Sequence, residues 1–289
     1  MKFRIVSDSS SNVLSMGDSD YTTVPLKIIA EKEYVDDAAL DLAGMMEDLR
    51  NHKGKSGSSC PNMGEWLEAF GDAEEIFCVT ISRNLSGSYA ASVQAGETYM
   101  EEHPGRKVFT FDSLAVGPEM MMIVDKIRQC EAEGCDYETT KAKVLKYHNH
   151  THTVFCLESM LNLARNGRVS MAVAKIAGML GIRVVGIAAD GQVTPVHKPR
   201  GAKKATQTIV EMIKERGFKD GNILRVAHCY APEAAEALRE AILAEFPNTR
   251  FILEHTTALC SFYAEAGGLI IGFEGAFNTE NDNGKYYKV

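Results

Sequence analysis

Short apolar runs alternate with polar turns and amphipathic segments along the first half of the chain. Residues 3–6, 76–81 and 107–111 are apolar runs typical of buried strands, and a polar loop follows each of them. A further strand is predicted at 23–29, near a sheet edge, because Pro25 cannot donate a ladder hydrogen bond. Repetition of strand, loop and helix predicts a parallel sheet covered by helices, which is a Rossmann-like lobe.

The second half of the chain has a different pattern. A strand at 182–189, the turn Asp190-Gly191 and a strand at 192–196 predict a β-hairpin, which requires antiparallel pairing. We therefore expect an α/β protein with two lobes, 1–155 around a parallel sheet and 156–289 around a mixed or antiparallel sheet. The other strands predicted in this half are 224–230 and 250–255, and the apolar run 267–273 closes the lobe. Helices are predicted at 157–165, from Ser170, from the cluster 197–205 to about Arg216, and at 232–246. The tail from Asn278 is polar and is expected to be frayed.

Three histidines alternate in one segment, at His148, His150 and His152. On a strand they would project from one face, which could suggest a transition-metal site. Alternate side chains of a strand lie roughly 7 Å apart, too far for three imidazoles to share one ion without distortion. We expect a solvated, titratable strand edge here and no metal site.

The methionine-rich run 120–124 is predicted to be helical. Unbranched side chains of this kind could line a pocket for a flexible ligand chain, although packing in an ordinary core is their more common use.

Composition and charge narrow the class of protein. The chain has 289 residues, of which 45% are hydrophobic, and this length favours two lobes over one compact domain. A net charge of -8 without a basic block argues against a nucleic-acid partner. We find no apolar run that could span a bilayer and no signal peptide, and the seven scattered cysteines suit reduced thiols, so we expect a cytoplasmic protein. We find no phosphate-binding or dinucleotide motif either, which predicts no cofactor and no use of ATP by the chain itself.

Two hydroxyl-rich segments are candidate binding sites for an oxyanion. Ser86, Gly87 and Ser88 lie between a predicted strand and a predicted helix, where free backbone N–H groups and the helix dipole favour an anion. Ser58 and Ser59 precede a Cys-Pro pair at a second predicted helix entry. The alternative for both segments is an ordinary capped helix start.

Two arginines are candidates for holding an anion. Arg168 follows Asn166-Gly167, a left-handed turn signal, and so lies at a junction between two predicted helices. Arg200 belongs to the basic cluster 197–205, which could bind an anionic ligand or a partner's acidic face, or could be a solvated helix end.

The ordered set of segments, rather than any single one, resembles the DegV family of bacterial lipid-binding proteins. Better-understood members of that family are fatty-acid-binding subunits of a fatty acid kinase. The segments that carry the resemblance are 5–10, 24–26, 34–36, 58–62, 85–89, 111–113, 166–170 and 199–201.

The resemblance implies a two-lobed, DegV-like protein that holds one long-chain fatty acid in a tunnel, with the carboxylate at the lobe interface. It implies that Ser58 and Ser86 bind this carboxylate. It also implies that the protein catalyses no phosphorylation itself and presents the carboxylate to a separate, ATP-binding kinase subunit. Arg168 and Arg200 would lie at the lobe interface or at the surface that faces the kinase.

One departure from the family pattern affects the head-group site. Members often carry a His-x-Gly-Pro-Gly segment near the C-terminus, and the corresponding residues here are 263–267. Tyr263 would place a neutral phenol where the family has a titratable imidazole, and Glu265 would oppose an anionic ligand unless it points away. Lipid binding agrees better with these changes than a kinase partnership does.

Two other classes of function stay open. An acyl or phosphoryl transferase could use polar residues that converge at one sheet edge, namely Asp8, Ser9, Ser86, Asp112 and Ser113. A sugar- or phosphate-binding module would have a polar cleft in place of an apolar tunnel.

Overall fold

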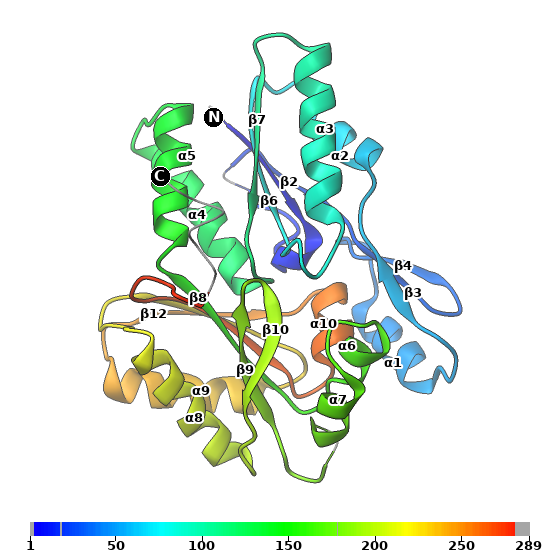
Figure 1. The fold of residues 1–289 in the computed structure, drawn as a ribbon, viewed down its shortest axis with the longest axis vertical. Helices are drawn as coiled ribbons and strands as arrows, with labels where there is room; N and C mark the ends of the chain where they lie inside the picture. Colours follow the sequence, from blue (N-terminus) through cyan, green and yellow to red (C-terminus); the bar gives the residue numbers. More distant parts are fainter. Residues whose placement is uncertain (1–2, 18, 178, 281–289) are drawn as a thin grey trace.

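Two β-sheets, one in each lobe, organise the chain (Figure 1). The computed structural model describes residues 3–17, 19–177 and 179–280. The first sheet has four parallel strands in the order β2-β1-β6-β7. Their bounds are Arg4–Asp8 for β1, Tyr21–Val24 for β2, Glu75–Thr80 for β6 and Lys107–Asp112 for β7. A short 3-10 helix, Ser9–Ser11, follows β1.

The continuous apolar run of β6 has a physical cause, which is burial on both faces of the sheet. Ile76 and Cys78 pack into a core with α2 and α3, whereas Phe77 and Val79 pack into a second core with α4 and α5. Strands covered on both faces have no polar face and therefore do not alternate in sequence. The helices are α2 (Met63–Phe70), α3 (Ser88–Glu102), α4 (Pro118–Ala132) and α5 (Tyr137–His148).

The predicted strand at 23–29 is wrong as one element. The chain leaves the parallel sheet after Val24, at Pro25, and Leu26 donates its backbone N–H to Ser9 Oγ at 3.0 Å. Residues Lys27–Ile29 then form β3, the central strand of a small antiparallel sheet with β4 (Glu33–Val35) and β5 (Gly57–Ser59). Helix α1 (Leu42–Asn51) lies between β4 and β5 in sequence.

The second lobe contains a six-stranded mixed sheet in the order β10-β9-β8-β13-β11-β12. Only the β11–β12 pair is parallel among these strands. The predicted fold class, a parallel-sheet lobe followed by a mixed-sheet lobe, is therefore confirmed. The strands are β8 (Thr151–Leu157), β9 (Val184–Ala189), β10 (Gln192–His197), β11 (Ile223–His228), β12 (Arg250–His255) and β13 (Leu269–Glu274).

Helices cover both faces of this sheet. The buried residues of α8 and α9 pack on one face, and those of α6, α7 and α10 pack on the other, which faces the first lobe. Helix α10 also contributes Leu259 and Phe262 to the core of the first lobe, so late residues of the chain help to build its early half. The bounds are α6 (Leu161–Arg165), α7 (Met171–Ala177), α8 (Ala202–Glu215), α9 (Pro232–Glu245) and α10 (Ala258–Ala264).

The expected strand edge at His148, His150 and His152 is wrong. His148 ends α5, and the strand that follows, β8, is an interior strand buried along its whole length. Nε2 of His148 lies 2.8 Å from the Ser113 carbonyl oxygen, and burial lowers the pKa of both His148 and His152. In the part of the chain that the structure describes, no group of His, Cys, Asp and Glu side chains could hold a metal ion.

The change from the first sheet to the second falls before the expected boundary. Residue 155 lies inside β8, and every residue of this strand belongs to the second sheet. We place the change of sheet between α5 and β8, while a division into lobes at that point stays a proposal.

The end of the described chain is anchored to β8. Asn278 was expected to begin a frayed tail, but it is buried, and its Nδ2 donates to the Thr151 carbonyl oxygen at 2.8 Å. Residues 281–289, the rest of that predicted tail, lie outside the described residues. Within the described ranges, no helix is long and apolar enough to cross a membrane. The cytoplasmic location stays a prediction.

Candidate functional site

A cavity of about 840 Å³, including its opening to solvent, lies between the two lobes. Its floor is the face of the six-stranded sheet that carries Thr153, Phe155 and Leu157 of β8. Its opposite wall comes from loops at the carboxyl ends of β6 and β7, from Leu26 and Ser58, and from α10. Ligands of open parallel sheets bind at this edge.

The floor of the cavity follows from the two-residue period of β8. Thr153, Phe155 and Leu157 face the cavity, whereas Val154 and Cys156 face the core beneath α8 and α9. Side chains alternate across a strand, so this one segment lines a ligand cavity and completes a core. The lining of the cavity is predominantly apolar.

The three consecutive methionines of α4 belong to the core. Met120, Met121 and Met122 are each at most 1% exposed, and none of them lines the cavity. These methionines therefore pack in the core and do not line a ligand pocket.

Four polar side chains from four separate segments meet at the cavity wall: Ser58, Ser86, Arg168 and Tyr263. Ser58 Oγ on β5 and the Tyr263 hydroxyl oxygen on α10 are 2.8 Å apart. Two hydroxyls that share one hydrogen bond use one of their two hydrogens, so the pair keeps one O–H donor for a ligand.

Ser86 contributes a second hydroxyl donor. Its Oγ accepts a hydrogen bond from the backbone N–H of Ser88 at 3.3 Å, which leaves the hydroxyl hydrogen available. The turn that carries Ser86 is held by a hydrogen bond from its backbone N–H to the Ser82 carbonyl oxygen at 3.2 Å. The donor is thus on a fixed loop at the end of β6.

Arg168 brings a positive charge to the same place. Its Nε donates to the Leu85 carbonyl oxygen at 3.2 Å and its Nη1 to the Asn166 carbonyl oxygen at 2.5 Å. Its guanidinium carbon lies 5.6 Å from the centre of the Tyr263 ring, within the range of a cation–π contact. Gly167, with φ of 75°, forms the predicted left-handed turn that places Arg168 there. Among the described residues, Nη2 of Arg168 has no hydrogen-bond acceptor, so it can donate to an anion.

The other predicted site residues lie outside the cavity lining. Ser59 neighbours Ser58 on β5, where the strand period directs successive side chains to opposite faces. Gly87 precedes the first residue of α3, and Arg200 is exposed and forms an isolated backbone bridge with Ile182.

Ser88 is buried, and its hydroxyl donates to Asp8 Oδ2 at 2.6 Å, so it organises the loop instead of facing the cavity.

The position predicted for Ser58 at a helix entry is also wrong. Ser58 lies on β5, and α2 begins only at Met63, with Asn62 as its N-cap and Glu65 completing a capping box. The Ser58 hydroxyl is therefore presented by a strand, without help from a helix dipole.

The acidic residues at the sheet edge serve the loops around the cavity. Asp8 accepts hydrogen bonds from the Ile81 backbone N–H at 3.0 Å and from the hydroxyls of Ser10 and Ser88, and burial raises the pKa of its carboxyl. Asp112 likewise accepts from the backbone N–H groups of Arg83 and Leu114, each at 3.1 Å. Of the five residues proposed to converge in a transferase, only Ser86 lines the cavity.

Sequence reasoning missed helix α10, which carries Tyr263 together with the lining residues Leu259 and Cys260. The helix is held by Asp36, whose carboxylate accepts from the backbone N–H of Ala258 at 2.7 Å and of Leu259 at 3.1 Å. Thr257 at the N-cap, followed by an apolar run, was the available signal.

Glu265 does not face the cavity. It accepts a hydrogen bond from the Asn162 backbone N–H at 3.1 Å, and it is absent from the lining. The Glu265 carboxylate is therefore not in close contact with a ligand in the cavity and does not repel its negative charge at short range.

Comparison with known proteins identifies the family. Residues 2–274 match the family model described as "Uncharacterised protein, DegV family". The chain belongs to the DegV family. A DegV domain-containing protein of Streptococcus pneumoniae is 34% identical over 280 residues, which cover 95% of this chain and 99% of that relative.

Two similar solved structures are of proteins loaded with fatty acids. A DegV family protein from Eubacterium eligens, loaded with heptadecanoic acid, is 36% identical with a TM-score of 0.92, over 94% of this chain and 99% of that one. The fatty acid kinase B3 protein of Streptococcus pneumoniae, loaded with linoleic acid, is 34% identical with a TM-score of 0.92, over 95% and 99% of the two chains.

Proposed function

We propose that this DegV protein binds one long-chain fatty acid in the interlobe cavity. The observation that carries the proposal is an apolar cavity in which hydroxyl donors and a guanidinium gather at one place. An acyl chain would gain about 0.8 kcal/mol for each CH₂ removed from water, and the polar cluster would orient its carboxylate. The fatty acids in the two similar structures support the same ligand class.

Each polar residue has a defined part in this proposal. Ser86 and the Ser58–Tyr263 pair donate hydroxyl hydrogens to the carboxylate oxygens. Arg168 supplies a charge-assisted hydrogen bond from Nη2, which is stronger than a bond between neutral groups. A phosphate- or sugar-binding module is disfavoured, because most of the cavity wall offers such a ligand no polar contact.

We further propose that the protein acts as a carrier without catalysis and presents the bound carboxylate to a separate kinase subunit. The similarity to the fatty acid kinase B3 protein supports this step. Arg200 is exposed and lies outside the cavity, so its part in the proposal is at a partner surface. Formation of an acyl phosphate from bound fatty acid, ATP and a purified kinase subunit tests the partnership. Absence of product with a subunit that phosphorylates fatty acid on a known carrier would contradict it.

Ligand binding is tested by organic extraction of the purified protein, mass spectrometry of the extract and titration with a long-chain fatty acid. We expect one bound fatty acid for each chain, and weaker binding by Ser86→Ala. Ser59→Ala is the matched control, since Ser59 lies outside the lining, and its affinity should equal that of the wild type. A protein that carries no lipid and binds none in titration would refute the proposal.

A further inference from the structure

The cavity floor can be followed row by row along the paired strands of the second sheet. Phe155 of β8 pairs with Gly186 of β9 on one side and with Ile270 of β13 on the other. Phe155, Ile270 and Thr153 all line the cavity, and Thr153 lies two residues before Phe155 on β8. At about 3.3 Å per residue, the floor extends roughly 13 Å from Leu157 to Thr153.

The first turn of α4 lies against the sheet beside Thr153. Thr153 pairs with Gly272 of β13, and the helix backbone lies directly on this glycine. A Cβ at Gly272 would come within 2.7 Å of the Glu119 nitrogen and 2.9 Å of the Pro118 carbonyl carbon. Gly272 therefore permits contact between the backbone of α4 and the sheet, and α4 covers the sheet on the β13 side of Thr153.

A buried acid, Glu119, fixes the side chain of Thr153 at the cavity wall. The Thr153 hydroxyl donates to Glu119 Oε2 at 2.5 Å, and Thr151 Oγ1 lies 2.6 Å from Glu119 Oε1. Nε2 of His148 lies 3.8 Å from the same Oε1. Because its hydroxyl is bound to Glu119, Thr153 can contact a ligand through its methyl group.

We propose that Thr153, held in place by Glu119 at the first turn of α4, is the closed end of the acyl tunnel and sets the longest fatty acid that the protein accepts. Thr153 contacts the terminal methyl group of the ligand, and Glu119 is a positioning residue behind it. The inference rests on the proposed function, because it requires the acyl chain to run along β8 away from the carboxylate cluster.

The test is a series of saturated fatty acids from 12 to 22 carbons, titrated against the wild type and two variants of Thr153. In the wild type, affinity should rise about 4-fold for each added CH₂ up to a limit and fall beyond it. Thr153→Ala removes the methyl and hydroxyl groups and should move this limit by one or two carbons. Affinity for the first rejected length should then rise about 4- to 15-fold.

Thr153→Val is the matched control, because it keeps the shape of the side chain and loses only the hydrogen bond to Glu119. Its limit should equal that of the wild type, although the variant should be less stable. Val193→Ala, in the side wall on β10, widens the cavity without lengthening it and should leave the limit unchanged.

The outcomes separate this inference from the proposed function. A wild type that binds every length with a constant gain for each CH₂, or a folded Thr153→Ala variant with the wild-type limit, overturns the closed end but not fatty acid binding. A wild type that binds no fatty acid refutes both. Should Thr153→Ala fail to fold, a crystal structure with an ω-brominated fatty acid decides. We expect bromine in van der Waals contact with Thr153, and bromine elsewhere overturns the inference.

Discussion

Replacing Glu119 with glutamine should remove a loss of stability that the protein undergoes as pH rises from 5 to 8. Glu119 is 2% exposed, and burial raises the pKa of its carboxyl from 4.5 to about 7. Hydrogen bonds from Thr151 and Thr153 oppose this rise but do not offset it. The folded protein therefore holds Glu119 largely as a neutral acid below pH 7.

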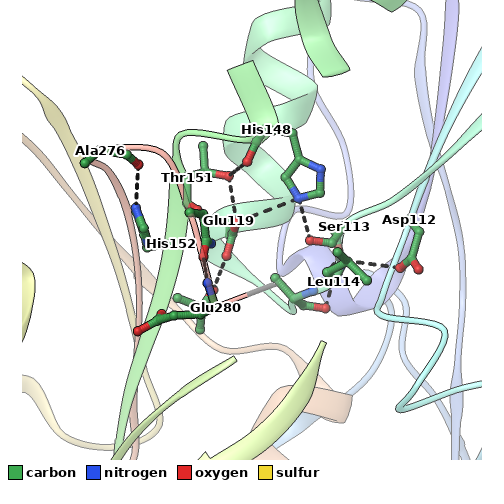
Figure 2. A network of polar contacts seen from close by, with 12 residues as sticks. Asp112, Ser113, Leu114, Glu119, His148, Thr151, His152, Ala276 and Glu280 are labelled. Atoms are coloured by element: carbon green, nitrogen blue, oxygen red, sulfur yellow. Dashed lines mark hydrogen bonds and ion pairs between the residues drawn. The ribbon is translucent and has the colours of Figure 1, made fainter. Parts of the chain in front are cut away.

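The hydrogen-bond geometry agrees with a neutral acid (Figure 2). Thr151 Oγ1 lies 2.6 Å from Glu119 Oε1 and 3.0 Å from the His148 carbonyl oxygen, which can only accept. A hydroxyl has one hydrogen, so it cannot donate fully to both oxygens. Both contacts are satisfied when Glu119 carries the proton and donates it to Thr151.

The sign and size of the effect follow from linkage. The unfolded carboxyl ionises near pH 4.5 and the folded one only near pH 7, so raising the pH between these values favours the unfolded chain. The stabilising contribution of neutral Glu119 is fully present below pH 4.5 and is lost as pH passes 7. At 1.36 kcal/mol for each unit of pKa, the loss is about 3 kcal/mol. Glutamine has the same shape and never ionises, so the variant should not lose this stability as the pH rises.

The assay is equilibrium unfolding in urea at pH 5, 6, 7 and 8 for both proteins. The free energy of unfolding of Glu119→Gln minus that of the wild type should grow by about 2.5 kcal/mol between pH 5 and pH 8, because part of the loss falls below pH 5. His148, whose pKa is lowered by burial, and Glu280, which raises the pKa of Glu119, are present in both proteins, so their own titrations largely cancel. The exposed Glu211→Gln on α8 is the control and should parallel the wild type. A difference that stays constant with pH would refute the neutral acid.

Three further predictions concern the carboxylate cluster and the hairpin beside it. Ser58→Ala and Tyr263→Phe should each weaken fatty acid binding about 2- to 10-fold. The double variant should weaken binding by less than the product of the two single effects, because the two hydroxyls share one hydrogen bond. A double-mutant cycle measured by calorimetry that shows additive free energies would contradict this. Arg168→Met should lower affinity for the fatty acid about 10- to 100-fold but leave that for its methyl ester unchanged in competition assays, whereas equal losses would exclude a charge interaction. Asn84→Ala removes the 2.6 Å hydrogen bond to the Asp190 carbonyl oxygen, which connects the β9–β10 turn to the Ser86 loop. Release of fatty acid, measured by stopped flow, should then be several-fold faster. An unchanged release rate would count against a role of this turn in retaining the ligand.

The strands and the sheet class could be predicted because buried strands have a recognisable pattern of apolar residues in the sequence. The run at 76–81 is apolar throughout, since its residues are covered by helices on both faces. The turn at Asp190 and Gly191 has φ angles of 50° and 70°, which its residue types favour. Where a local signal had two meanings, prediction was wrong: the histidines 148–152 alternate like a strand, yet a helix ends among them.

The cavity residues could be predicted only in part, because contacts between distant segments leave no local signal. Ser58 and Ser86 follow from hydroxyl-rich loops, but neither loop shows that Ser58 meets Tyr263, 205 positions away. Ser88 resembles Ser86 in sequence, but in the folded chain Ser88 is buried and bound to Asp8, whereas Ser86 lines the cavity. Glu119, the buried acid behind the floor, lies in a helix start where an acidic residue is ordinary.

The most direct test of the account is a crystal structure of the protein with one long-chain fatty acid. We predict carboxylate oxygens within hydrogen-bond distance, about 2.5–3.2 Å, of Ser86 Oγ and of the Ser58–Tyr263 pair, with the acyl chain lying over Phe155 of β8. A carboxylate that lies beside Thr153, or a fatty acid bound outside the interlobe cavity, would contradict it.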